Sequence, residues 1–127
     1  MAERKQEVEY VKIEISHLDY LLICHVTKLR LVKGLSQVKL TQKMGLSEGF
    51  IGKVEQFSER AKYNIRHLHL LAKALEIKLE ELIPKEKPRY DMVTLTLKRT
   101  NKVNKDGSVS SKKSTEVVSI EPIVSRA

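Results

Sequence analysis

The chain has 127 residues, enough for one modest domain with an extension and too few for two full domains. It carries 24 lysine and arginine residues against 16 aspartate and glutamate residues, and this formal net charge of +8 favours a polyanionic partner. Cys24 is the single cysteine, so an internal disulfide is excluded. No apolar run approaches the roughly 18 residues of a membrane span, and none forms a signal sequence. We therefore expect a cytoplasmic protein with no membrane partner.

Residues 7–15, EVEYVKIEI, alternate charged with apolar residues and predict a short strand with Val11, Ile13 and Ile15 on one face. A helix is the competing interpretation. Ser16 followed by Asp19 is typical of a helix start, however, and would interrupt one continuous helix. We therefore assign residues 1–16 to an N-terminal strand or arm.

A helix is predicted from about His17 to Lys33, ended by Gly34. Its apolar residues recur at spacings of three and four, which is typical of a helix with one buried face. The residues expected to face inward are Leu18, Leu22, Val26 and Leu29. A second apolar flank of Leu21, Ile23 and Cys24 indicates that another segment or a second subunit covers this helix.

Residues 36–56 predict two short helices joined by a tight turn. Ser36 and Ser47 can cap them, and Gly45 suits a turn residue with positive φ. Gly49 and Gly52 in the second helix cost roughly 1 kcal/mol each relative to alanine, so tertiary packing must hold it. The residues expected in the shared core are Val38, Leu40, Met44, Leu46, Ile51 and Val54.

The positive charge is concentrated around these helices. Residues 28–66 carry nine basic and three acidic side chains, whereas residues 1–27 carry three basic and five acidic ones. This distribution favours a polyanion-binding surface over the alternative of a solvated basic face.

Further along, residues 57–63 predict a polar basic loop, and Asn64 predicts the cap of another helix. A last short helix is expected from about Leu79 to Pro84. His67 and His69 would lie about 200° apart on their helix and cannot share a metal. The residues expected on the inward stripe are Ile65, Leu68, Ala72 and Leu75.

The composition changes at Lys85. Two alternating segments, YDMVTLTLKR and TEVVSIEPI, predict strands, the first with Val93, Leu95 and Leu97 on one face. Between them lies a lysine- and serine-rich stretch with the turn signal Asp106-Gly107. We expect residues 85–127 to form an antiparallel hairpin with a long flexible tip, paired with the strand at 7–15; a disordered tail is the alternative.

Residues 26–83 resemble the helix-turn-helix domain of the phage repressor and Cro family, the XRE family. The residues that carry the resemblance are Leu35, Ser36, Gln37, Leu40, Gly45, Ser47, Ile51, Val54 and Glu55. It implies a mainly α, five-helix DNA-binding domain at residues 17–84, which the N-terminal strand and the C-terminal hairpin make α+β overall. Thr41 and Phe57 depart from the pattern. Thr41 replaces a small alanine and predicts a looser helix contact, and Phe57 replaces a glycine and predicts a different exit from the second helix.

The resemblance also implies residue roles. Gln37 corresponds to a glutamine that contacts phosphate and supports the recognition helix, while Glu48, Gly49 and Lys53 correspond to base-facing positions. Glu48 could instead serve only the helix dipole. Arg30 and Glu55 correspond to an internal salt bridge. The full set of expected DNA-binding residues is Gln37, Lys39, Lys43, Ser47, Glu48, Gly49, Phe50, Lys53, Arg60 and Lys62. Phe50 could contact a thymine methyl group or pack internally, and the latter is favoured.

The sequence contains no nucleotide-binding glycine loop, metal-ligand cluster or recognisable nucleophile, so we expect neither an enzyme nor a cofactor. The leading hypothesis is a sequence-specific regulator of transcription, a repressor that binds double-stranded DNA as a homodimer. One alternative is an antitoxin whose residues 85–127 cover a toxin partner. Another is a protein-interaction module that has lost DNA binding.

Overall fold

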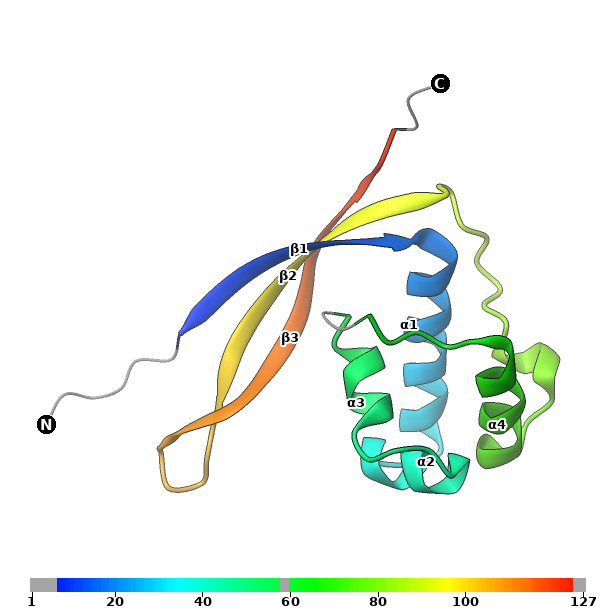
Figure 1. Ribbon diagram of the computed structural model, residues 1–127, viewed down its shortest axis with the longest axis horizontal. Coiled ribbons are helices and arrows are strands. Elements are labelled where there is room, and N and C mark those ends of the chain that lie inside the picture. The colour runs from blue at the N-terminus through cyan, green and yellow to red at the C-terminus, as the bar shows by residue number, and fades with distance from the viewer. Residues whose placement is uncertain (1–6, 58–59, 125–127) are drawn as a thin grey trace, which may run out of the picture.

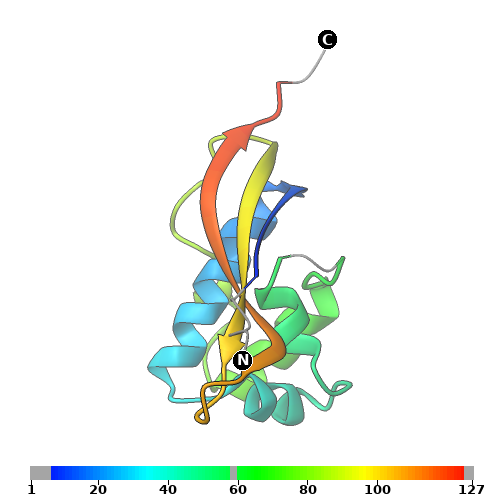
Figure 2. The ribbon, with the colours of Figure 1, turned by 90° about the vertical axis from the view of Figure 1, so that its left-hand side faces the viewer.

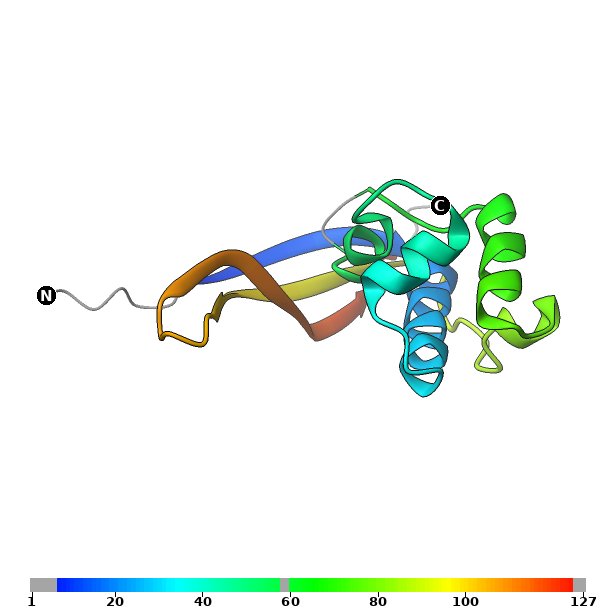
Figure 3. The ribbon, with the colours of Figure 1, turned by 90° about the horizontal axis from the view of Figure 1, so that it is seen from below.

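The computed structural model describes residues 7–57 and 60–124, and over these ranges it is an α+β fold (Figure 1). The helices form one cluster, and the sheet lies beside it and projects beyond it (Figures 1 and 3). Residues 1–6 and 125–127 of the two expected end segments lie outside the described residues. The elements are β1 (Val8–Ser16), α1 (His17–Val32), α2 (Gln37–Met44), α3 (Phe50–Glu55), α4 (Ile65–Leu75), the 3-10 turn η1 (Leu79–Leu82), β2 (Met92–Val103) and β3 (Val109–Pro122).

The α+β architecture is confirmed, and the helical elements all lie within residues 17–84, but five α-helices are not found in the described part of the chain. The described residues contain four α-helices, and the segment before Pro84 forms only the four-residue 3-10 turn η1. Ile83, directly before this proline, is extended with ψ 124°. A proline ring disfavours helical backbone at the preceding residue, so the turn cannot grow into an α-helix. The strands of 9, 12 and 14 residues also make the sheet a large part of the fold.

The starts of α1 and α2 agree with the sequence prediction. The Ser16 hydroxyl accepts a hydrogen bond from the Asp19 N–H at 2.9 Å, and the Ser36 hydroxyl accepts one from the Lys39 N–H at 3.0 Å. Gly45 ends α2 in the left-handed conformation, with φ 70°. Each boundary therefore follows from local side-chain and backbone preferences.

The start of α3 differs from the prediction. Ser47 does not cap the helix; Gly49 is the capping residue, with φ 83° and no side-chain bond. Residues 47–50 form a turn in which the Ser47 carbonyl accepts from the Phe50 N–H at 3.2 Å. Because Gly49 adopts the left-handed backbone that glycine allows, α3 begins later and contains only six residues.

The three strands form one antiparallel sheet in the order β1-β2-β3, so the predicted hairpin and its pairing with the N-terminal strand are both found. In the register, Ile15 lies opposite Val93, and Leu95 lies opposite Ile120. The long flexible tip is wrong, because β2 and β3 extend to a short turn at residues 104–108. Within it Gly107 has φ 86° and donates to the Asn104 carbonyl at 2.9 Å.

Helices and sheet share one apolar core. Val93, Leu95 and Leu97 of β2 are fully shielded from solvent, and they belong to the same cluster as Ile23 of α1 and Ile51 of α3. The sheet therefore contributes side chains to the cluster that buries the second apolar flank of α1. The sequence analysis had inferred that another segment must cover this flank. The predicted inward positions Leu18, Val38 and Ile65 are wrong, since they are exposed by 51%, 60% and 87%.

Among the described residues, no helix is both long and apolar enough to cross a membrane.

Candidate nucleic-acid interface

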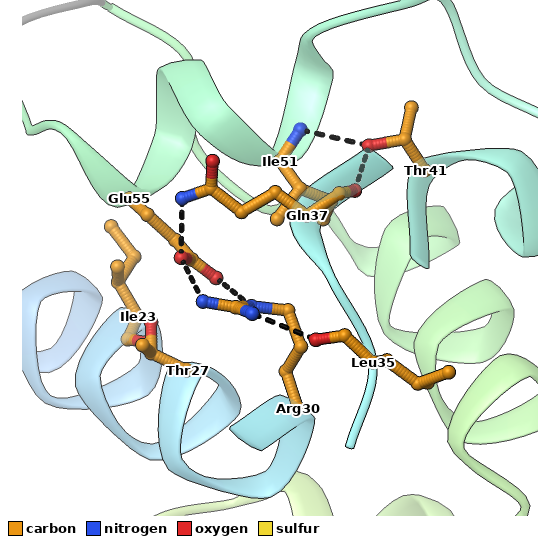
Figure 4. A network of polar contacts seen from close by, with 8 residues as sticks. All are labelled: Ile23, Thr27, Arg30, Leu35, Gln37, Thr41, Ile51 and Glu55. Carbon is orange, nitrogen blue, oxygen red and sulfur yellow. Dashed lines mark hydrogen bonds and ion pairs between the residues drawn. The ribbon is translucent and has the colours of Figure 1, made fainter. Parts of the chain in front are cut away.

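An ion pair between Arg30 and Glu55 fixes α3 to α1. The Arg30 Nε and Nη2 atoms donate to the two carboxylate oxygens of Glu55, each at 2.8 Å, and Nη1 donates to the Leu35 carbonyl at 2.8 Å (Figure 4). The side chains of Arg30 and Glu55 are only 10% and 7% exposed. Such a bidentate contact fixes both the distance between the two side chains and their relative orientation. The end of α1, the following loop and the end of α3 are thereby joined.

Gln37 extends this network from the start of α2. Its Nε2 donates to Glu55 Oε1 at 2.8 Å (Figure 4). The side chain passes close to Gly52, where an added Cβ would lie 3.4 Å from Gln37 Oε1. A side chain at this position would therefore begin in van der Waals contact with Gln37. The sequence singled out Gly52 for its cost within a helix but did not reveal this neighbour.

Thr41 joins α2 directly to α3. Its hydroxyl donates to the Gln37 carbonyl at 2.8 Å and accepts from the Ile51 N–H at 3.3 Å (Figure 4). The first N–H groups of a helix lack partners within the helix, and here a buried side chain satisfies one of them. The prediction that Thr41 loosens this contact finds no support, since its hydroxyl adds a hydrogen bond that an alanine could not make.

Aromatic side chains hold the two ends of α3. Phe50 lies against Tyr63 and His67, with ring centroids 6.1 and 4.6 Å away, so it packs within the protein. Partial burial lowers the pKa of His67. At the other end Phe57 has φ 57°, the left-handed backbone that a glycine would favour, so the predicted different exit from the helix is not found, and its ring lies 5.5 Å from that of Tyr20.

The remaining expected site residues lie on the surface. Ser47, Glu48 and Gly49 occupy the turn before α3 and are exposed. The exposed basic residues are Lys39 and Lys43 on α2, Lys53 on α3, and Arg60 and Lys62 in the following loop. The ion pairs found between described residues are Arg30 with Glu55 and Lys113 with Glu9, so none of these five cations is neutralised by a described carboxylate. No three His, Cys, Asp or Glu residues in the described ranges could hold a metal ion.

The open face of α3 borders a groove of about 590 Å³ that the sequence did not predict. One wall contains Gly49, Gly52, Lys53 and Gln56, and the opposite wall belongs to the β2–β3 hairpin. The hairpin residues that line it include Arg99, Lys102, Lys112 and Lys113. The sequence did contain a sign of this basic wall, since residues 98–113 carry six basic side chains and one acidic side chain. The segment was interpreted as a flexible tip instead.

No protein-family model and no curated protein matches this chain. Among solved structures, the restriction-modification controller protein C.AhdI from Aeromonas hydrophila is 32% identical, over 50% of this chain and 92% of its own, with a TM-score of 0.44. A variant of the restriction-modification controller protein C.Esp1396I is also 32% identical, over 53% of this chain and 92% of its own, with a TM-score of 0.46. A hypothetical transcription factor, NHTF from Neisseria, is 25% identical over 54% of this chain and 77% of its own, with a TM-score of 0.47. These three solved structures, each similar to about half of this chain, are two restriction-modification controller proteins and a hypothetical transcription factor.

Proposed function

We propose that this chain is a sequence-specific, DNA-binding regulator of transcription that acts as a repressor and as a homodimer. The observation that carries the proposal is the pairing of a rigid support with a free basic surface. Arg30, Gln37 and Glu55 fix α2 and α3 to α1, whereas Lys39, Lys43 and Lys53 remain exposed. Base recognition requires a pre-oriented element, and phosphate binding requires unpaired cations.

In this proposal α3 lies in the major groove and α2 crosses the backbone. Lys53 donates to guanine, and Glu48 accepts from the amino group of cytosine. Gly49 brings the backbone close to the bases without a side-chain contact. Gln37 acts mainly through Glu55, with which it shares a 2.8 Å hydrogen bond. Phosphate contacts come from Lys39, Lys43, Ser47, Arg60 and Lys62, and Phe50 supports the site by packing on Tyr63.

A six-residue recognition helix reads few base pairs, so tight binding needs a second copy. The sheet order β1-β2-β3 leaves one edge of β1 and one edge of β3 without a partner strand in the described chain. Such edges favour pairing between copies across a two-fold axis. The two α3 helices would then occupy half-sites about one helical turn apart, and occupancy of a promoter would repress it.

The antitoxin alternative is disfavoured by the hairpin. Residues 92–122 form two strands of the sheet, and Val93, Leu95 and Leu97 contribute to the core. A segment with this structural role is not a free arm that could cover a toxin. The alternative of a protein-interaction module predicts that no duplex is bound in a salt-sensitive manner.

Selection of binding sites from random duplex DNA, followed by titrations at several salt concentrations, tests the proposal. The log-log slope of affinity against salt should be roughly −4 to −8 for a dimer, at ~0.9 per phosphate contact. A slope near zero, or failure to enrich any sequence, would contradict it.

Substitutions separate base from backbone contacts. Lys53→Ala should weaken the selected site more than random DNA, because a base contact discriminates by about 1–3 kcal/mol. Lys39→Ala should weaken both equally, and Lys73→Ala on α4 serves as the control with little effect. An unchanged ratio of specific to non-specific affinity in Lys53→Ala would refute the base-contact role.

A further inference from the structure

The β2–β3 hairpin carries a dense positive charge next to α3. Here "the arm" denotes residues 98–113, which comprise the end of β2, the turn and the start of β3. The arm contains Asp106 as its one acidic residue and six basic residues, Lys98, Arg99, Lys102, Lys105, Lys112 and Lys113. It projects beyond the helices on the side of α3, and its turn lies level with α2 (Figures 1 and 2). The arm has a higher charge density than the helix-turn-helix segment itself.

The position of the arm is set by the fold. The β2–β3 register shifts at Thr96/Leu97 and again at Asn101/Val103, and such irregularities bend a strand and increase its twist. Lys113 Nζ forms an ion pair with Glu9 Oε2 at 3.0 Å, which ties the arm to β1. Hydrogen bonding to Lys113 lowers the pKa of the Glu9 carboxyl. The arm is therefore directed toward one side of the helical cluster.

Two adjoining hollows, of about 590 and 460 Å³, lie between the arm and α3. Both are lined by Gln37 and Gln56 on the helical side and by Lys102 and Lys113 on the arm. Together they form one groove, which passes α3 in the larger hollow and reaches Thr27 and Lys28 of α1 in the smaller one. The part beside Lys53 also includes Arg99 and Lys112, and no carboxylate lines it.

The cationic side chains that line the groove outnumber its carboxylates. Glu55 is the one carboxylate in its lining, and Arg30 already occupies both of its oxygens. The Nε of Arg99 is shielded from solvent and has no acceptor among the described residues. Like charges held close together repel one another, and a bound polyanion removes this repulsion.

We propose that the arm is a second DNA-contacting element, and this proposal rests on the proposed function. When α3 lies in the major groove, Lys102 and Lys112 contact phosphates of the strand that flanks that groove. The sugar-phosphate backbone then runs between α3 and the arm. These contacts carry no base information, so the arm raises affinity for all duplexes and fixes the orientation of α3.

The test uses the full chain and a charge-matched pair of variants. Lys102→Gln/Lys112→Gln removes two cations from the groove. Lys73→Gln/Lys85→Gln removes two exposed cations elsewhere, from α4 and the segment after η1. Circular dichroism and thermal melting establish that both variants fold, and fluorescence titration with the selected duplex and a random duplex at several salt concentrations measures affinity.

We expect the groove variant to lose about tenfold in affinity on both duplexes, and its salt slope to become shallower by ~0.9 for each lost contact, or ~2 per subunit. The control variant should retain nearly the wild-type slope. Ethylation interference should show phosphates whose modification blocks the wild type but not the groove variant.

Equal behaviour of the two variants would overturn the proposal, as would tighter binding by the groove variant, which would mean that the arm obstructs DNA. If DNA binding is unchanged and only an acidic peptide loses affinity, the groove serves a protein partner and the proposal is wrong. A wild-type chain that binds no duplex at all refutes the proposed function itself, and the wild-type titration distinguishes this result from failure of the arm alone.

Discussion

The buried pair of Arg30 and Glu55 gives the sharpest quantitative prediction. Arg30→Met leaves the Glu55 carboxylate with the single donor Gln37 Nε2 and removes both charge-assisted bonds from Arg30. Glu55→Leu leaves the guanidinium with the Leu35 carbonyl as its one remaining partner. Each single substitution should destabilise the fold by about 3–5 kcal/mol, because an uncompensated charge stays in a nearly buried site.

The double variant should lose much less than the sum of the two single variants. When both groups become apolar, neither leaves an isolated charge, so we expect a coupling free energy of about 2–4 kcal/mol. Urea denaturation followed by circular dichroism measures all four corners of the cycle, and equal m-values establish that the comparison concerns stability alone.

The exposed pair of Lys113 and Glu9 is an internal control. Its side chains are 37% and 49% exposed, so solvent screens the attraction and the coupling should be close to zero. The reasoning fails if the Arg30–Glu55 coupling is no larger than that of this control, or if the double variant is as unstable as the two single losses added together.

Three further substitutions test other local arguments. Thr41→Val keeps the shape but removes the hydroxyl that accepts from the Ile51 N–H, and should cost about 1–3 kcal/mol in urea unfolding; no loss would mean that this hydrogen bond contributes nothing. Glu76→Gly should stabilise the chain by about 1 kcal/mol, because Glu76 ends α4 in the left-handed conformation with φ 56°, and an unchanged melting temperature would contradict this. Burial lowers the pKa of His67 in the folded protein from its ordinary value of 6.5, so its contribution to stability is present above about pH 6.5 and is lost as the pH falls through the folded pKa. His67→Gln retains a capping side chain and should flatten the dependence of stability on pH between 7 and 5, and a slope equal to that of the wild type would exclude His67 as the titrating group.

Local rules placed most helix boundaries from sequence because the groups that decide them are neighbours in the chain. Ser16, Ser36 and Asn64 each accept a hydrogen bond from an N–H three residues later. Gly45 supplies the positive φ that ends α2. The same logic failed at Ser47, because Gly49, two residues on, offered a competing conformation that moved the start of α3.

Long-range contacts were harder to obtain from sequence. Alternation identified Val93, Leu95 and Leu97 as one face of a strand, and these residues are fully buried. Helical spacing correctly placed Val26 of α1 in the core, but it also placed Leu18 there, which is exposed, and left Ile23, which is buried, on the second flank. The correct choice depends on the sheet, and the sheet is built from segments about 80 residues apart in the chain.

By itself, the sequence determined the helix-turn-helix segment, the three strands and the positive charge, since these depend on residues close together in the chain. Only the tertiary structure decided that Gln37 reaches Glu55 over Gly52 and that Thr41 satisfies the start of α3. It also decided that Lys102 and Lys112 lie across a groove from Lys53. The physical reason is that these neighbours are set by strand register, by the bends at the two register shifts and by the shared core, all of which bring together residues distant in sequence.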